Sequence, residues 1–133
     1  MSEKIFDPIE DVIEAFRNGA VIVMTDDEQR ENEGDLICAA DKVTPEIINF
    51  MVTHARGLVC VPMEENQLRR LGLSHMVPAH SSDKYHTAFM DSVDVRQDTT
   101  TGISAGDRAH TVKALVSDTS EAADFIKPGH MFP

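Results

Sequence analysis

The chain has 133 residues, 41% hydrophobic and 26% charged, and this composition argues against a disordered, collagenous or low-complexity protein. Its 23 acidic residues outnumber its 12 lysines and arginines, so the net charge of −11 argues against unaided binding to nucleic acid or to an anionic membrane. The length predicts a single domain over residues 1–133, and the lack of a signal-peptide core or of an apolar run near ~20 residues predicts a cytoplasmic protein.

The first predicted elements are a helix over residues 8–18 and a strand over residues 20–25. The apolar side chains of the helix recur with a helical period, Asp7 is expected to cap its start, and Gly19 can adopt the left-handed conformation that ends it. The strand is a continuous apolar run rich in β-branched residues, which predicts that both of its faces are covered.

Acidic residues dominate the next segment, Asp26–Asp35, where six acids and one arginine give −5 of the total charge of −11. On composition alone, a solvated hairpin loop is the expected structure. However, carboxylates this crowded repel one another unless a cation or a positive group lies among them. Arg30 offers a planar fork for carboxylate or phosphate, and Mg²⁺ needs only one or two carboxylates besides water and substrate oxygens. The segment is therefore also a candidate site for a divalent cation.

The spacing of this segment excludes an EF-hand calcium loop. Counting from Asp26 places Arg30 at the fifth position and Ile37 at the twelfth, where a bidentate Glu is required. The common motifs of phosphate loops, dinucleotide sites, hydrolases and zinc proteases are also absent from the sequence.

Short elements are predicted over the rest of the chain. The middle is expected to form a strand over 36–40, a helix from Pro45 that ends before Gly57, a strand over 58–61 and a helix over 64–71 ended by Gly72. Residues 73–86 predict a mobile loop of the kind that closes over a substrate. The last part is expected to form a strand from Phe89, a helix from Ser104 to about Val116 with Asp107 in its capping box, and a helix over 121–126. Helices and strands that mix without strict alternation predict an α+β domain.

Cysteine and histidine give weaker signals in this sequence. Cys38 and Cys60 lie far apart in apolar stretches without a C-x-x-C pair, so both are expected to be reduced thiols. His130 by itself is an ordinary turn residue after Pro128 and Gly129. Four further histidines are expected to be solvated side chains, namely His54, His75, His80 and His86. His110 is expected to be a structural residue within a helix.

Three blocks of the sequence together resemble one enzyme family. DDEQRENEGD at 26–35, DTTTGISAGDRAHT at 98–111 and KPGHMFP at 127–133 are similar, in the same order, to segments of the 3,4-dihydroxy-2-butanone 4-phosphate synthases of riboflavin biosynthesis. The resemblance implies a three-layer α+β fold, with a mixed β-sheet between helices on both faces. It also implies a homodimer with active sites at the subunit interface, and two Mg²⁺ or Mn²⁺ ions per site. The implied lyase reaction converts D-ribulose 5-phosphate into 3,4-dihydroxy-2-butanone 4-phosphate and formate.

The resemblance also implies roles for individual residues. Arg30 and Glu31 match the substrate-contacting pair, and Glu31 matches a metal ligand as well. Glu33 and Asp35 match further active-site acids, with Asp35 also a substrate contact, and either one would shuttle protons. The remaining matches are an essential histidine and two residues that line the active site, namely His130, Cys60 and Thr101.

Two departures from the family pattern affect these expectations. The pattern continues beyond the position of Pro133 into an R-x-G-H-T-E block and a later glutamate, which supply a second metal ligand, phosphate contacts and a catalytic group. Without them, Glu31 is expected to hold a metal weakly, and apolar faces are expected to be exposed. Asp91 stands where the family shows a Thr-rich apolar strand, so the register of the strand from Phe89 is left open.

Two functions stay open at this point. The first is a Mg²⁺-dependent lyase on ribulose 5-phosphate that is complete only with the later part of the family pattern. The second is a non-catalytic fragment or derivative of the fold that acts as an acidic dimerising module. The sequence also leaves open which acid is the general base, whether Mg²⁺ or Mn²⁺ is preferred, and whether a GTP cyclohydrolase domain follows.

Overall fold

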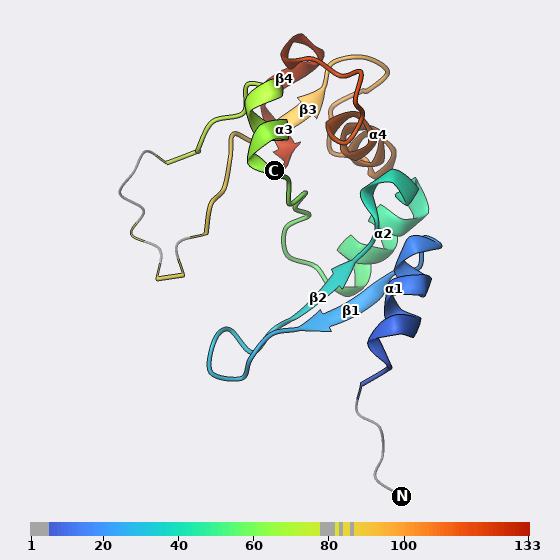
Figure 1. Cartoon of the computed structure of the whole chain (residues 1–133). Coiled ribbons are helices and arrows are strands. Elements are labelled where there is room, and N and C mark those ends of the chain that lie inside the picture. Colours follow the sequence, from blue (N-terminus) through green and yellow to red (C-terminus); the bar gives the residue numbers. More distant parts are fainter. Residues whose placement is uncertain (1–5, 78–81, 83, 86) are drawn as a thin grey trace, which may run out of the picture.

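The computed structural model describes residues 6–77, 82, 84–85 and 87–133, and these residues form an α+β structure, as the sequence predicts. No helix in this part of the chain is both long enough and apolar enough to cross a membrane. The elements follow one another in this order (Figure 1): α1 Ile9–Arg17, β1 Ile22–Thr25, β2 Gly34–Ile37, η1 Ala40–Lys42, α2 Pro45–His54, α3 Glu65–Arg70, β3 Val93–Val95, α4 Ala105–Leu115, η2 Ala122–Asp124 and β4 Phe125–Met131.

The strands form two antiparallel pairs. β1 pairs with β2 around the acidic segment, so that Thr25 lies opposite Gly34. β3 pairs with β4, and the register of this pair shifts between Val93 and Asp94. Figure 1 shows β1, β2 and α1 at one end of the structure, with β3, β4, α3 and α4 at the other end and α2 between them.

Within the described part of the chain, a parallel pairing occurs beside the antiparallel β3–β4 pair and nowhere else. Cys60 forms a parallel bridge with Phe132, and His75 forms an antiparallel bridge with Met90. The predicted strand over 58–61 is therefore reduced to a single bridge at Cys60. Among the described residues, the implied mixed sheet consists of the β3–β4 pair with these two bridges, while β1 and β2 stay separate from it.

The core lies between α4, α2 and the β3–β4 pair. α4 contacts both β3 and α2, which joins the two ends of the structure. The apolar side chains with the least exposure are Ile48, Leu71, Val93, Leu115 and Met131.

The two faces of β1 are open, although the sequence predicts a strand covered on both faces. Val23 is 69% exposed and Met24 is 54% exposed. Successive strand residues point to opposite faces, so both faces carry exposed apolar side chains, although α1 contacts β1 and Ile22 is half-buried. The prediction of exposed apolar faces is confirmed here.

The chain end forms a strand, so the predicted helix over 121–126 is wrong. A short 3₁₀ turn at η2 comes first, where the Asp124 carboxylate accepts a hydrogen bond of 2.8 Å from the Glu121 amide. Phe125 then pairs with Val95 and is buried. Pairing across the sheet therefore overrides the local helical signal.

Most local helix signals are confirmed. The Thr44 side chain accepts a hydrogen bond from Ile47 at the start of α2, and Gly19 ends α1 with φ +88°. The predicted Asp7 cap is wrong, because Pro8 is the N-cap residue of α1 and no side chain caps that end. Part of the loop predicted over 73–86 lies outside the described residues, including the positions of His80 and His86.

Candidate active site

Asp26 organises the acidic segment between β1 and β2. Its Oδ1 accepts a hydrogen bond of 2.9 Å from the Glu33 amide, and its Oδ2 accepts one of 3.0 Å from the Glu31 amide. These two backbone bonds are the main cause that lowers the pKa of Asp26, and Arg30 adds to the effect. The segment therefore folds around one ionised carboxylate.

Arg30 is the positive group that the crowded carboxylates require. Its Nη1 donates to Asp26 Oδ2 at 3.0 Å and to Glu31 Oε2 at 2.8 Å. The bond to Asp26, followed by the charge of Glu31, raises the pKa of Arg30. The Arg30 side chain is 53% exposed, so these ion pairs add little to stability and act by fixing positions.

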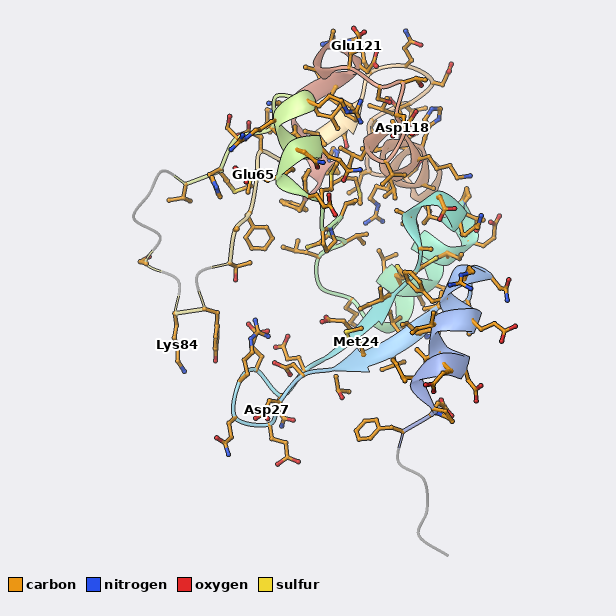
Figure 2. The ribbon with its side chains drawn as sticks, in the orientation of Figure 1. Met24, Asp27, Glu65, Lys84, Asp118 and Glu121 are labelled. Atoms are coloured by element: carbon orange, nitrogen blue, oxygen red, sulfur yellow. The ribbon has the colours of Figure 1, made fainter. Side chains whose placement is uncertain are left out.

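The loop predicted to close over a substrate touches this hairpin. The Tyr85 hydroxyl donates a hydrogen bond of 3.1 Å to the Arg30 carbonyl, and the Arg30 guanidinium lies 5.6 Å from the centre of the Tyr85 ring. Figure 2 shows Lys84, the neighbour of Tyr85, on the side of the hairpin that carries Asp27. Tyr85 thus contacts the acidic segment directly.

Asp35 belongs to β2 and influences Cys60. Burial of the sulfur raises the pKa of the Cys60 thiol, and the negative charge of Asp35 raises it further. A thiol with a raised pKa is a poor nucleophile, although the residue as a whole is solvent-exposed. The Cys60–Phe132 bridge also places this residue beside the end of β4.

His130 on β4 is held by Asp94 on β3. The His130 Nδ1 lies 2.7 Å from Asp94 Oδ2, and the His130 amide donates a hydrogen bond of 2.9 Å to Asp94 Oδ1. The Asp94 side chain is 8% exposed and that of His130 is 40% exposed. A carboxylate oxygen accepts hydrogen bonds, so the neutral tautomer that fits this contact carries its proton on Nδ1 and leaves Nε2 as an acceptor.

Two glycines permit the close approach around this pair. A Cβ at Gly129 would lie 2.0 Å from the backbone carbon of Val93. A Cβ at Gly102 would lie 2.1 Å from Asp94 Oδ2 and 2.7 Å from His130 Nδ1. Gly102 has φ +88°, which favours glycine. Thr101 therefore lies next to a backbone segment packed against the histidine, and its own side chain is exposed.

The predicted site residues fall into three groups. Arg30 and Glu31 gather around Asp26, Asp35 lies near Cys60, and His130 pairs with Asp94. In Figure 1 the hairpin tip points away from β4, the strand that carries His130.

The donor set at the hairpin fits a hard cation that takes most of its ligands from water and substrate. Arg30 Nη1 already bridges the carboxylates of Asp26 and Glu31, which shows that their oxygens converge on one positive group. Within the described ranges, no three His, Cys, Asp or Glu side chains gather as a preformed metal site.

Sequence reasoning missed three residues of these groups: Asp26 as the organiser, Tyr85 and Asp94. Asp94 gave a usable signal, because an acid between Val93 and Val95 in an apolar strand needs a partner when buried. Its partner His130 lies 36 positions away, and no local pattern identifies it.

The chain is similar to known proteins over nearly its whole length. Residues 10–133 match the family model described as 3,4-dihydroxy-2-butanone 4-phosphate synthase. The riboflavin biosynthesis protein RibBA of Bacillus cereus strain AH187 is 52% identical over 129 residues, which are 97% of this chain and 32% of that protein. RibBA of Bacillus subtilis strain 168 is 51% identical over 129 residues, which are again 97% of this chain and 32% of that protein. This chain therefore spans about a third of the length of these relatives.

Solved structures of the same family are also similar to this chain and are also longer than it. A 3,4-dihydroxy-2-butanone 4-phosphate synthase in complex with two magnesium ions has a TM-score of 0.93 and 47% identity, covering 96% of this chain and 59% of that one. The synthase of Candida albicans has a TM-score of 0.86 and 45% identity, covering 98% of this chain and 63% of that one.

Proposed function

The chain belongs to the 3,4-dihydroxy-2-butanone 4-phosphate synthase family, and we propose that it provides the acidic hairpin and the histidine of a lyase that converts D-ribulose 5-phosphate into 3,4-dihydroxy-2-butanone 4-phosphate and formate. The observation that carries the proposal is the Asp94–His130 pair at 2.7 Å, because it gives one side chain a fixed orientation and a free proton-accepting nitrogen.

Proton transfer is the chemistry that these groups support. Enolising a ketose removes a proton beside a carbonyl while negative charge grows on oxygen, so a base and an electrophile must face the same atoms. His130 Nε2 is the proton acceptor in this proposal, and Asp94 holds the ring and stabilises its charged form. Glu33 or Asp35 carries the second proton transfer.

The hairpin is the substrate-binding part of the proposal. Both bonds from Arg30 to carboxylates use Nη1, so the rest of the guanidinium fork is available for a sugar phosphate oxygen. Tyr85 holds the Arg30 carbonyl and fixes the backbone at this position. Thr101 contributes a further substrate contact from the turn beside His130.

We propose Mg²⁺ as the cofactor, with Mn²⁺ as an alternative, and Glu31 as its ligand. The solved relative with two magnesium ions and the converging carboxylates of Asp26 and Glu31 support this assignment. When bound, such an ion would polarise the substrate oxygens and orient them. Carboxylate oxygens are suitable ligands for both Mg²⁺ and Mn²⁺.

We also propose a homodimer in the cytoplasm. The hairpin tip points away from β4, the strand that carries His130, and a second copy would bring the hairpin of one subunit to the histidine of the other (Figure 1). The exposed side chains of Val23 and Met24 support an interface near the hairpin. The free thiols of Cys38 and Cys60 support a reducing compartment.

The test measures formate release from ribulose 5-phosphate by the natural protein that contains these residues, with Mg²⁺ present. We expect His130→Ala and Glu31→Ala each to lower kcat by about 10²-fold or more. Glu28→Ala is the matched control, because it removes an exposed acid from the same hairpin, and its rate should stay within about twofold of wild type. No formate from the wild type, or full activity in Glu31→Ala, would contradict the proposal.

A further inference from the structure

The Asp107 carboxylate, near the start of α4, accepts three hydrogen bonds from residues that lie before the helix. Its Oδ2 accepts from the Thr100 hydroxyl at 2.8 Å and from the Gly102 amide at 3.0 Å, and its Oδ1 accepts from the Thr100 amide at 3.2 Å. The residue is 6% exposed. The Thr100 hydroxyl is the main cause that lowers the pKa of Asp107, so the carboxylate is ionised and only accepts.

Helix capping does not account for these bonds. Ser104 caps α4, because its hydroxyl accepts a hydrogen bond of 3.0 Å from the Asp107 amide. In a capping box the side chain of the third helical residue would return to the backbone amide of the cap. The Asp107 carboxylate instead holds two residues outside the helix, Thr100 and Gly102.

The segment held by Asp107 packs directly on the Asp94–His130 pair. Gly102 approaches so closely that a methyl group there would overlap Asp94 Oδ2 and crowd His130 Nδ1, at 2.1 Å and 2.7 Å. The position of the Gly102 backbone therefore decides how much room the imidazole ring has. The Gly102 amide is fixed by the Asp107 carboxylate at 3.0 Å.

We propose that Asp107 is a positioning residue for His130. By fixing the turn over residues 100–102, it keeps the Gly102 backbone against the Asp94–His130 pair and holds the imidazole in the tautomer that leaves Nε2 as its proton acceptor. Thr101, inside the same turn, is placed by the same bonds. The effect on catalysis rests on the lyase function proposed above, whereas the positioning itself does not.

The test uses nuclear magnetic resonance on the chain with Asp107→Asn. The amide keeps the size of the carboxylate but replaces one acceptor oxygen with a donor and removes the charge, so it cannot accept all three bonds from Thr100 and Gly102. We expect exchange of the Gly102 amide proton to accelerate by about tenfold or more, because its hydrogen bond no longer goes to a charged group and the turn has lost at least one bond. We also expect the ¹⁵N shifts of His130 to move from the Nδ1-protonated tautomer toward a mixture.

Ser104→Ala is the matched control at the same end of α4. It removes the hydrogen bond to the Asp107 amide and the Ser104 contribution to the Asp107 carboxylate, but it leaves the bonds from Thr100 and Gly102 in place. The helix should therefore lose stability while the His130 tautomer stays unchanged. A purely structural Asp107 would behave like Ser104. An unchanged His130 tautomer in folded Asp107→Asn would therefore overturn the proposal.

A milder variant covers the case in which Asp107→Asn does not fold. Thr100→Val removes only the hydroxyl bond of 2.8 Å, and the same displacement of the His130 ¹⁵N shifts, in smaller amount, is expected. An unaffected ring in this variant would also refute the inference. If the natural protein releases formate, Asp107→Asn should lower kcat by a larger factor than it raises the KM for ribulose 5-phosphate, because the main effect is on the proton-accepting His130 and the smaller one on the substrate contact of Thr101. A wild type without activity would defeat the lyase proposal and leave the resonance result standing.

Discussion

At the scale of single residues, the acidic hairpin depends on the charge state of Asp26. Its pKa lies below the ordinary value of 3.8 because the amides of Glu33 and Glu31 donate to it. A carboxyl with a lowered pKa in the folded state stabilises structure above its unfolded pKa and loses this contribution as the pH falls through the lowered value.

The first prediction is a pH-dependent loosening of this hairpin. From about pH 4 downward, the Glu31 and Glu33 amide resonances should move toward random-coil positions as Asp26 takes up a proton. Asp26→Asn should remove this pH dependence, because the amide does not titrate. Equal movement of the two amide resonances with pH in wild type and Asp26→Asn would contradict the assignment of Asp26 as organiser.

Asp94 allows a second prediction at this scale. Asp94→Asn keeps an acceptor for the His130 amide, but its amide nitrogen faces Nδ1 and favours the wrong ring tautomer. We expect kcat of the natural protein to fall by about 10²–10⁴, with the KM for ribulose 5-phosphate nearly unchanged. Asp118→Asn, an exposed acid that Figure 2 shows at the far end from Asp27, is the control and should not change kcat. Equal rates for both variants would remove Asp94 from the site.

The site could be predicted from the sequence only where its residues are close in the chain. Arg30 and Glu31 lie within one acidic segment, and the structure brings both to Asp26. The Asp94–His130 pair forms through the register of β3 with β4, which depends on packing across the whole domain.

At the scale of elements, helices were predicted better than strands, because the signals that start and end a helix lie close together in the chain. Thr44 and Ser104 cap their helices with bonds to residues three positions later, so the signal is entirely local. The segment after Glu121 has helical composition but becomes β4, because Phe125 and Met131 find buried positions against β3. Long-range pairing of this kind leaves no periodic trace in seven residues that include Pro and Gly.

The third prediction concerns the contact between β3 and β4. In Gly129→Ala the new Cβ would meet backbone atoms of Val93 at 2.0 Å and Asp94 at 2.2 Å, so the strands must separate. We expect a loss of about 3 kcal/mol or more in the free energy of unfolding, measured with urea. Gly106→Ala is the matched control within α4, because its nearest neighbour is Ser104 Oγ at 3.7 Å. It should gain about 0.5–1 kcal/mol from helix propensity, and a similar loss in both variants would contradict the packing argument.

At the scale of the whole molecule, the charge and the apolar surface oppose each other. The net charge of −11 makes copies of the chain repel one another, whereas Val23 and Met24 expose apolar area on opposite faces of one hairpin. The sequence predicts a strand covered on both faces, whereas the described residues leave Val23 and Met24 exposed even though α1 contacts the strand. These two side chains are therefore available to a second copy of the chain.

The last prediction is that the chain associates through this hairpin in a manner that depends on salt. Screening of the net negative charge shortens the range of repulsion to about 8 Å at physiological ionic strength, so added salt should increase the mass seen in sedimentation equilibrium. The double change Val23→Thr and Met24→Thr keeps strand propensity while it removes apolar surface, and it should shift the chain toward monomer. Ile126→Thr is the control, because it removes an exposed apolar side chain from β4, at the other end of the structure, and should leave the association unchanged. A wild type that stays monomeric at high salt, or an equal effect of the control, would show that the open faces of the hairpin do not drive association.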